Sequence, residues 1–461
     1  MSAFDKVIGY RSAKEELSQI LDMFKNSEVY KDMGAKLPHG VLLYGAPGMG
    51  KTLLATSFIE EAGVKTYVVK STKGKNAILK DISDAFESAK QDDKAIIFFD
   101  DMDKFSSSQG RDVDDPIFVA IQSGIDSVKD KDILVIATVN NIDKLPSSLR
   151  RNGRFDCKLR ISTPGRKDAA KIVEYYLRKR KVDPNANYDD IAKMINYSSC
   201  ADLDKVVNKG AIIAAYKRKP CVQTEDIVEA YLGDTYDLDD WEEKSVEERR
   251  STSLHEAGHC VVCEVIKKGS VGLVSVRTRD GFTKRCLALT RRPQQVLISL
   301  AGKVACELYD KGRVASGCYY DLKNATQLIK DGLTASGTNG TALLYPGDSS
   351  VHSLSDAYKD RVIGAINTEL ERYLFLVRDI LIKNKDFLFA LRDELVEKGT
   401  LLHSDIQRIR SSFEVTPCEY SEKDEELSDD RGEPERNERG AMGPLDYDDE
   451  DDYGYLEDDD C

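Results

Sequence analysis

The sequence lacks any apolar run near the ~20 residues that a membrane-spanning helix needs. Its first residues, MSAFDKVIGYRSAKEEL, also lack the apolar stretch of a secretion signal. We therefore expect a chain that neither spans a membrane nor carries such a signal, and that reaches a membrane only through a partner. The 10 scattered cysteines predict free thiols in a reducing compartment such as the cytoplasm. Cys260 and Cys263 form a CxxC inside an apolar helical pattern, which favours small buried thiols over a redox or metal site.

An excess of positive charge is absent as well. The net charge is -14, but residues 416–461 alone hold 20 Asp and Glu against 4 Lys and Arg, which leaves the preceding residues near +2. A nearly neutral body does not indicate nucleic-acid binding. The acidic tail, rich in Gly and Pro, is predicted to be disordered, and it is either a solubilising extension or an arm that docks on a basic surface.

Histidine is scarce, yet two of the 5 histidines fall in the stretch LHEAGHCVV at 254–262. On a helix, His255 and His259 lie on one face, with Glu256 beside the first of them. Two imidazole nitrogens can hold zinc while a nearby carboxylate takes a proton from water. The longer HExxHxxGxxH arrangement is excluded because position 265 is Val265. Glu307, in VACELYD, is one possible third ligand.

Five short β-branched or aromatic runs fill the first third of the chain: GVLLYG, KTYVVK, AIIFFD, ILVIATVN and CKLRIS. Helical patterns such as LKDISDAFESAK lie between them. This alternation predicts a parallel α/β sheet with helices on both faces. From about Gly165 the strands stop and helical spacing dominates, interrupted by the β-like stretch VGLVSVRTRDGFTKRCLALT.

GAPGMGKT at 45–52 follows the apolar run VLLY and precedes a helical pattern. This is the context in which GxxxxGK[ST] binds nucleotide phosphates through inward-facing backbone N–H groups. Lys51 is expected to reach the β- and γ-phosphates, and Thr52 to ligate magnesium. The predicted nucleotide-binding residues are Gly45, Ala46, Pro47, Gly48, Met49, Gly50, Lys51, Thr52 and Leu53.

Polar residues end two further runs. Asp100 is expected to hold magnesium, and Asp101 to polarise the attacking water. Asn140, at the end of ILVIATVN, is expected to orient that water. In LRRNGRFD, Arg151 and Arg154 are candidates for arginine fingers that reach a neighbouring subunit's nucleotide, although either could be a solvated surface charge.

The order of these motifs resembles the FtsH family of AAA+ ATP-dependent zinc metalloproteases over about residues 5–410. The resemblance includes FDKVIGYRSAKEELSQI, GRFD, CADL, HEAGH, CYYDLKNAT and GTLLHSDIQRI. It implies that His255, His259 and Asp321 bind zinc and that Glu256 is the general base. It also implies that RDGFTKR, with Gly281, Phe282 and Thr283, pairs with the substrate backbone.

Together with the composition of the linker and the tail, the resemblance implies five segments. These are an AAA+ P-loop α/β ATPase domain (1–165), a helical lid (166–235), a charged linker (236–250), a mainly helical zinc protease domain (251–415) and the acidic tail (416–461). It further implies a hydrolase of protein quality control that uses zinc, ATP and magnesium, assembled as a homo-hexamer or as a hetero-hexamer with related subunits, with protein or peptide substrates.

The sequence departs from the family pattern in three respects. The usual N-terminal membrane segments are not seen. The second acidic residue after the AIIFF run is Asp101 where the family has Glu, which retracts the carboxylate by one methylene. No aromatic residue lies between Tyr67 and Phe86, where the family carries a substrate-gripping pore loop. These departures leave two alternatives: a slow or inactive ATPase that acts as a regulatory or chaperone-like ring subunit, or a zinc peptidase for unfolded chains in which ATP only assembles the ring.

Overall fold

The computed structural model describes residues 2–70, 74–105, 115–195, 199–236, 244–278, 281–289, 291–310, 317–334 and 356–422. Its first sheet is parallel, with strand order β2-β3-β4-β1-β5. The strands are β1 (Gly40–Tyr44), β2 (Lys65–Lys70), β3 (Lys94–Asp100), β4 (Asp132–Val139) and β5 (Cys157–Arg160). They coincide with the five apolar runs of the sequence, so the predicted α/β fold is confirmed.

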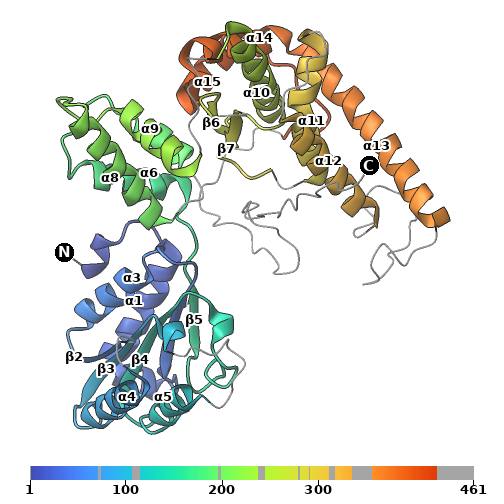
Figure 1. Cartoon of the computed structure of the whole chain (residues 1–461). Helices are drawn as coiled ribbons and strands as arrows, with labels where there is room; N and C mark the ends of the chain where they lie inside the picture. The colour runs from blue at the N-terminus through green and yellow to red at the C-terminus, as the bar shows by residue number, and fades with distance from the viewer. Residues whose placement is uncertain are drawn as a thin grey trace, which may run out of the picture. The chain divides into compact units, whose positions relative to one another are not determined.

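Helices cover both faces of this sheet (Figure 1). Successive strand residues point to opposite faces. In β1, Leu42 joins the apolar cluster under α4 and α5, whereas Val41 and Leu43 join the cluster under α1 and α3. All three are fully buried, which is why each strand reads as a continuous apolar run. The helices of this part are α1 (Arg11–Lys25), α2 (Ser27–Asp32), α3 (Lys51–Ala62), α4 (Lys75–Ala89) and α5 (Pro116–Asp126), with the short 3-10 helices η1 (Ala3–Lys6), η2 (Met102–Lys104) and η3 (Ile142–Lys144).

The order of the strands in the sheet determines which of the loops that follow them are neighbours in space. β3, β4 and β1 are neighbours in the sheet and run parallel. Their carboxyl ends therefore open at one edge, where ligands of open α/β sheets bind. Asp100 ends β3, Asn140 follows β4, and the P-loop follows β1.

A separate helical subdomain follows, with its own apolar core. It contains α6 (Arg166–Leu177), α7 (Tyr188–Met194), α8 (Cys200–Tyr216) and α9 (Thr224–Thr235). Asn187 and Ser199 start α7 and α8 with side-chain caps on backbone N–H groups. This subdomain corresponds to the predicted lid.

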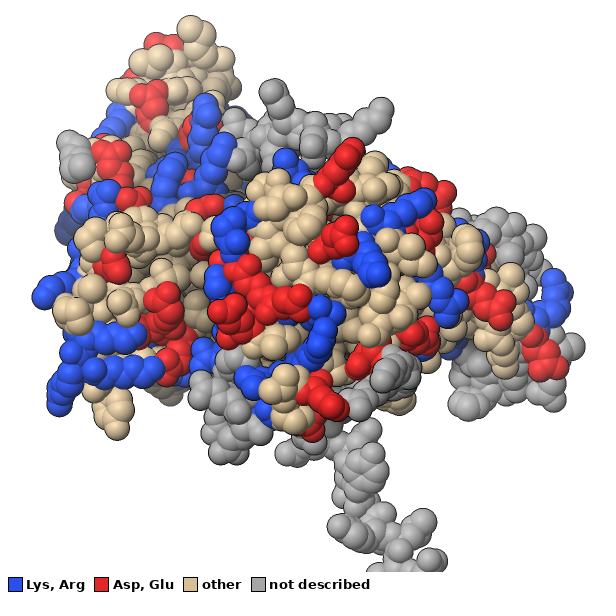
Figure 2. All heavy atoms as spheres, turned by 90° about the horizontal axis from the view of Figure 1, so that it is seen from above, with Lys and Arg blue, Asp and Glu red and all other residues tan. Residues whose placement is uncertain are grey.

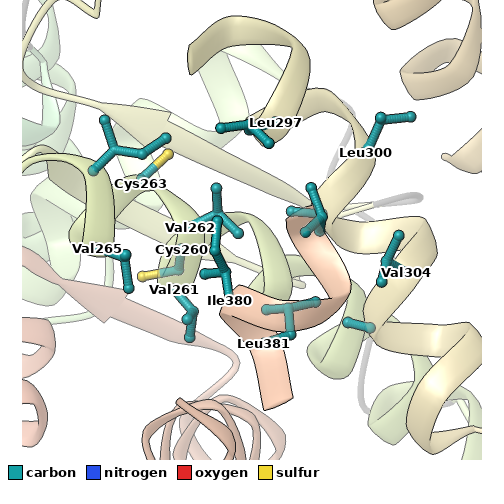
Figure 3. Packing of buried hydrophobic residues seen from close by; sticks show 14 of the residues in the cluster. Cys260, Val261, Val262, Cys263, Val265, Leu297, Leu300, Val304, Ile380 and Leu381 are labelled. Atoms are coloured by element: carbon teal, nitrogen blue, oxygen red, sulfur yellow. The ribbon is translucent and has the colours of Figure 1, made fainter. Parts of the chain in front are cut away.

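The remaining elements form a mainly helical part around a second large core. Its helices are α10 (Val246–Ile266), α11 (Arg292–Tyr309), α12 (Cys318–Thr334), α13 (Asp356–Lys383), α14 (Lys385–Lys398) and α15 (His403–Ser411). Cys260 and Cys263 of α10 lie among apolar side chains of α11 and α13 (Figure 3), and both are fully buried. These cysteines therefore behave as small core residues.

A small antiparallel sheet completes this part, with strand order β7-β6-β8. Its strands are β6 (Val271–Ser275), β7 (Phe282–Arg285) and β8 (Thr400–Leu402). β7 pairs only with β6 among the described strands, so it is an edge strand. An edge strand presents unpaired backbone groups that another extended chain can join.

Residues 416–422, which the sequence places in the acidic tail, lie against this helical part. The Glu422 backbone N–H donates to the Ile266 carbonyl (2.7 Å), and Ser421 Oγ donates to the Val265 carbonyl (2.7 Å). The rest of the predicted tail lies outside the described residues. So do residues 71–73 of the altered pore segment.

On the face drawn in Figure 2, basic and acidic side chains are interspersed. This mixture agrees with the nearly neutral charge of residues before the tail. Among the described helices, none has the length and apolar character needed to cross a bilayer.

Candidate functional site

The P-loop joins β1 to α3. Gly50 caps α3 with a φ of +85°, a left-handed conformation that favours glycine. Lys51, the first residue of α3, is 5% exposed. Its ammonium donates to the carbonyls of Gly45 and Ala46 and to Asn140 Oδ1, each at 2.8 Å. The lysine therefore lies inside the loop where phosphates would be cradled.

The acidic strand end lies beside this loop. Thr52 Oγ1 and Thr138 Oγ1 both donate to Asp100 Oδ1, at 2.9 and 2.7 Å. Asn140 Nδ2 donates to Asp101 Oδ1 at 3.3 Å. The structure thus brings together all the residues predicted for magnesium binding and hydrolysis.

Asp101 has an unusual conformation and a basic neighbour. Its φ is +51°, which is uncommon for a residue other than glycine. Its Oδ2 accepts a hydrogen bond from Lys104 Nζ at 2.7 Å. Lys104 was not singled out in the sequence, because an i,i+3 contact across a 3-10 helix does not show in a motif.

A cavity of about 540 Å³ adjoins the P-loop. The residues around it come from the N-terminal segment, the P-loop, η2, α6 and α8, and they include Val7, Ile8, Tyr10, Ile172 and Cys200. Tyr10 Oη donates to the Met49 carbonyl at 2.7 Å, which ties the N-terminal segment to the P-loop. A half-apolar cavity next to a phosphate cradle suits a nucleoside base.

The two candidate arginine fingers differ in setting. Arg151 is exposed. The Arg154 guanidinium forms hydrogen bonds to residues of its own chain, to Asp126 at 3.0 Å and to the Ser148 carbonyl at 2.7 Å. Arg151 is therefore the more accessible of the two.

The second site is centred on α10. His255 and His259 are one helical turn apart, and their Nε2 atoms are 3.1 Å apart. Asp321, in the first turn of α12, lies 3.2 Å from His255 Nε2 and 3.1 Å from His259 Nε2 through its Oδ2. Two imidazole nitrogens and a carboxylate oxygen thus converge on one point, which is the donor set of a zinc site with an open position.

The surroundings fix the direction of these donors. His259 Nδ1 lies 2.7 Å from the Ile298 carbonyl, which can only accept, so Nδ1 carries a proton and, in the neutral imidazole, Nε2 is left with the lone pair that a metal would need. A Cβ at Gly302 would lie 2.5 Å from His255 Cε1, so only glycine lets α11 approach that ring. Burial opposes ionisation of Asp321, but the imidazoles of His259 and His255 hold its pKa well below the usual range. The donor set fits a divalent metal.

Glu256 lies beside the donors and is 3% exposed. Burial raises the pKa of its carboxyl, although the two imidazoles act in the opposite direction. Thr283 Oγ1, in β7, lies 2.8 Å from Glu256 Oε2 and donates a hydrogen bond to it. A raised pKa brings a carboxylate closer to the range in which a general base works efficiently. This contact of Thr283 was missed in the sequence, because the two residues are 27 positions apart and belong to different elements.

Glu307, the alternative ligand, points elsewhere. Its carboxylate forms ion pairs with Lys303 and with Arg378, the latter at 3.1 Å. The geometry therefore favours Asp321. Cys318 was not identified from the sequence as a neighbour of this site. Its Sγ lies 3.7 Å from His255 Nδ1, the ring nitrogen that does not face Asp321.

The predicted substrate strand lies beside Glu256. Gly281 has a φ of +74°, and a Cβ there would lie 2.9 Å from Glu256 Cγ. Phe282 and Thr283 begin the edge strand β7. A peptide that added to this edge would lie close to the carboxylate.

Comparisons with known proteins point in the same direction. Residues 41–163 match the family model described as ATPase family associated with various cellular activities (AAA). Over 453 residues the chain is 28% identical to the ATP-dependent zinc metalloprotease FtsH of Aster yellows witches'-broom phytoplasma, covering 92% of the chain and 66% of that protein. It is 29% identical over 430 residues to the protein of that name from Lachnoclostridium phytofermentans, covering 87% and 74%. The corresponding protein of Malacoplasma penetrans is 28% identical over 468 residues, covering 92% and 56%. The chain thus spans between 56% and 74% of the length of these relatives.

Proposed function

The chain belongs to the FtsH family, and from that premise we propose that it is an ATP-dependent zinc metalloendopeptidase that unfolds and degrades proteins. The observation that carries the proposal is the convergence of His255, His259 and Asp321 beside a buried Glu256. The same chain holds a P-loop, so one polypeptide combines a hydrolytic centre with a nucleotide site.

His255, His259 and Asp321 would hold the zinc ion. When bound, zinc supplies a Lewis acid that makes water nucleophilic at neutral pH and polarises a carbonyl. Glu256 accepts the proton of the attacking water and then passes it to the leaving amine. The Thr283 hydroxyl holds that carboxylate in place, while the edge of β7 aligns an extended substrate through backbone hydrogen bonds. Recognition of backbone groups fits a broad range of protein substrates.

In the nucleotide site, Lys51 and the P-loop N–H groups would bind the phosphates of ATP, and Thr52 and Asp100 would hold magnesium. Asp101 and Asn140 orient the attacking water. Arg151 and Arg154 would act on a neighbour's nucleotide, which requires a ring, either a homo-hexamer or a hetero-hexamer with related subunits. The nine cysteines within the described residues are all free thiols, which fits a reducing compartment such as the cytoplasm.

Cleavage of an unfolded, casein-like chain by the zinc-loaded protein tests the peptidase part. Glu256→Gln keeps the size of the side chain but cannot accept the proton, so we expect cleavage to fall at least about a hundredfold. Zinc content and ATP binding should stay unchanged. Cleavage by Glu256→Gln at the wild-type rate would remove Glu256 as the base.

One observation favours a second candidate, a regulatory or chaperone-like ring subunit with slow ATP turnover. The Asp101 carboxylate, one methylene shorter than a glutamate, forms an ion pair with Lys104 at 2.7 Å. Slow ATP hydrolysis with full casein cleavage would support a peptidase in which ATP only assembles the ring. Slow hydrolysis without cleavage would support the regulatory subunit.

A further inference from the structure

The two faces of strand β7 contact different parts of the molecule. Phe282 and Lys284 point to one face and Thr283 to the other, because side chains alternate along a strand. The neighbouring strand β6 shows the same division. Leu273 belongs to the core of the α6–α9 subdomain, and Val274 belongs to the core around α10. The sheet is therefore shared between two cores.

On the first face, two tyrosines from the end of α9 hold β7. The Tyr236 ring stacks on Phe282, with ring centroids 4.0 Å apart and an interplanar angle of 19°. Lys284 Nζ donates a hydrogen bond to Tyr231 Oη and lies 4.6 Å from the centre of the same ring. Burial lowers the pKa of Lys284 to about 8. We call these four residues the tyrosine clamp.

On the opposite face, Thr283 contacts the carboxylate of Glu256 at 2.8 Å. The hydroxyl also lies 3.1 Å from the Glu256 backbone carbonyl. Thr283 is flanked on both sides by clamped residues, so a displacement of β7 away from α10 would carry Thr283 away from Glu256.

Further contacts join α7 of the helical subdomain to β6 and to α15, the helix that follows β8. The Ser404 N–H donates to Asp190 Oδ1 at 3.0 Å, and its hydroxyl donates to the other oxygen of that carboxylate. Asp190 is 2% exposed. A Cβ at Gly272 would lie 2.5 Å from the Lys193 carbonyl, so α7 and β6 are in close contact. The helical subdomain therefore contacts this part of the chain at several points besides the two tyrosines.

We propose that the tyrosine clamp transmits the position of the α6–α9 subdomain to the catalytic centre, with Thr283 as the residue that positions Glu256. The α6–α9 subdomain also lines the nucleotide cavity through Ile172 and Cys200, so a nucleotide bound there would contact the subdomain whose position the clamp transmits. This inference rests on the proposed peptidase function and adds that the position of the α6–α9 subdomain regulates it.

The test is a double-mutant cycle in the full chain, with a short quenched-fluorescent peptide as substrate because such a peptide needs no unfolding. Thr283→Val removes the hydroxyl at nearly constant shape, and Thr283→Ser restores it. Tyr236→Leu removes the stacking, and Tyr236→Phe restores it. Phe389→Leu is the matched control: it breaks an aromatic pair with Tyr309 (5.0 Å) that lies within the same helical part but does not contact β7.

We expect Thr283→Val and Tyr236→Leu each to lower kcat about tenfold with little change in KM, since substrate still adds to the β7 edge. The double variant should be no slower than Thr283→Val alone, because both act through one contact. Thr283→Ser and Tyr236→Phe should recover most of the cleavage rate, and Phe389→Leu should leave that rate unchanged. The ATPase rate and the zinc content should stay the same in all variants. The proposal would be overturned if the falls in kcat of the two single variants multiplied in the double variant, or if kcat were normal in Thr283→Val.

Hydrogen exchange separates this inference from the proposed function. Tyr236→Leu should speed exchange of the β7 amides at least about tenfold, whether or not the chain cleaves peptides. No cleavage by the wild type together with faster exchange would refute the peptidase function and leave the clamp intact as a mechanical link. Unchanged exchange in Tyr236→Leu would refute the clamp.

Discussion

Asp321→Asn is the most informative change in the metal centre. The carboxylate oxygen faces the Nε2 atoms of His259 and His255 at 3.1 and 3.2 Å. Histidines bind a metal in their neutral form, so the charge that this carboxylate would stabilise is that of the ion. A unit charge pair about 3 Å apart interacts by about 5 kcal/mol with an effective dielectric constant of about 20. An amide oxygen keeps part of this attraction as a dipole. If about half is lost, zinc affinity falls by about a hundredfold, since ~1.4 kcal/mol corresponds to a factor of ten.

The assay is competition for zinc against a chelator of known affinity, with Glu307→Gln as the matched control. Glu307 pairs with Lys303 and Arg378 instead of the histidines, so its substitution should change zinc affinity less than about threefold. Peptide cleavage at saturating zinc shows whether the remaining donors still support catalysis. A large loss of affinity in Glu307→Gln, with none in Asp321→Asn, would refute the assignment of the third ligand.

Two further predictions concern the nucleotide site and pH. Lys104→Met removes an exposed ion pair with Asp101 that is worth about 0.2–1 kcal/mol, so ATP turnover should rise by up to about fivefold. Asp101→Glu, which extends the carboxylate by one methylene, should also raise ATP turnover. Unchanged turnover in both variants would show that neither the pair nor the shorter carboxylate limits hydrolysis. Burial raises the pKa of Glu256 above its ordinary 4.5, and the base works only when ionised. Peptide cleavage should therefore be full above this raised pKa and fall as the pH drops through it. A midpoint at or below 4.5, with zinc still bound, would contradict a buried general base.

Much of the fold could be predicted from the sequence because parallel strands buried on both faces appear as continuous apolar runs. β1 to β5 lie where those runs predict them. The P-loop and HExxH could be predicted because their residues are close in sequence, so spacing alone fixes their geometry.

Contacts between distant segments could not be predicted in this way. Asp321 is 62 positions from His259, and only the family resemblance suggested it. The contact of Thr283 with Glu256, and the stacking of Tyr236 on Phe282, depend on how β7 is placed between two cores. Residues 416–422 have the composition of a disordered tail, yet Ser421 and Glu422 hydrogen-bond to the end of α10.

The central claim is that ATP hydrolysis drives proteolysis of folded substrates. The most direct measurement is degradation of a loosely folded fluorescent protein by the zinc-loaded chain with ATP, with a non-hydrolysable analogue and without nucleotide. We expect loss of fluorescence with ATP only, and none in Glu256→Gln. Equal degradation with the analogue would contradict it and would show that nucleotide serves only to assemble the ring.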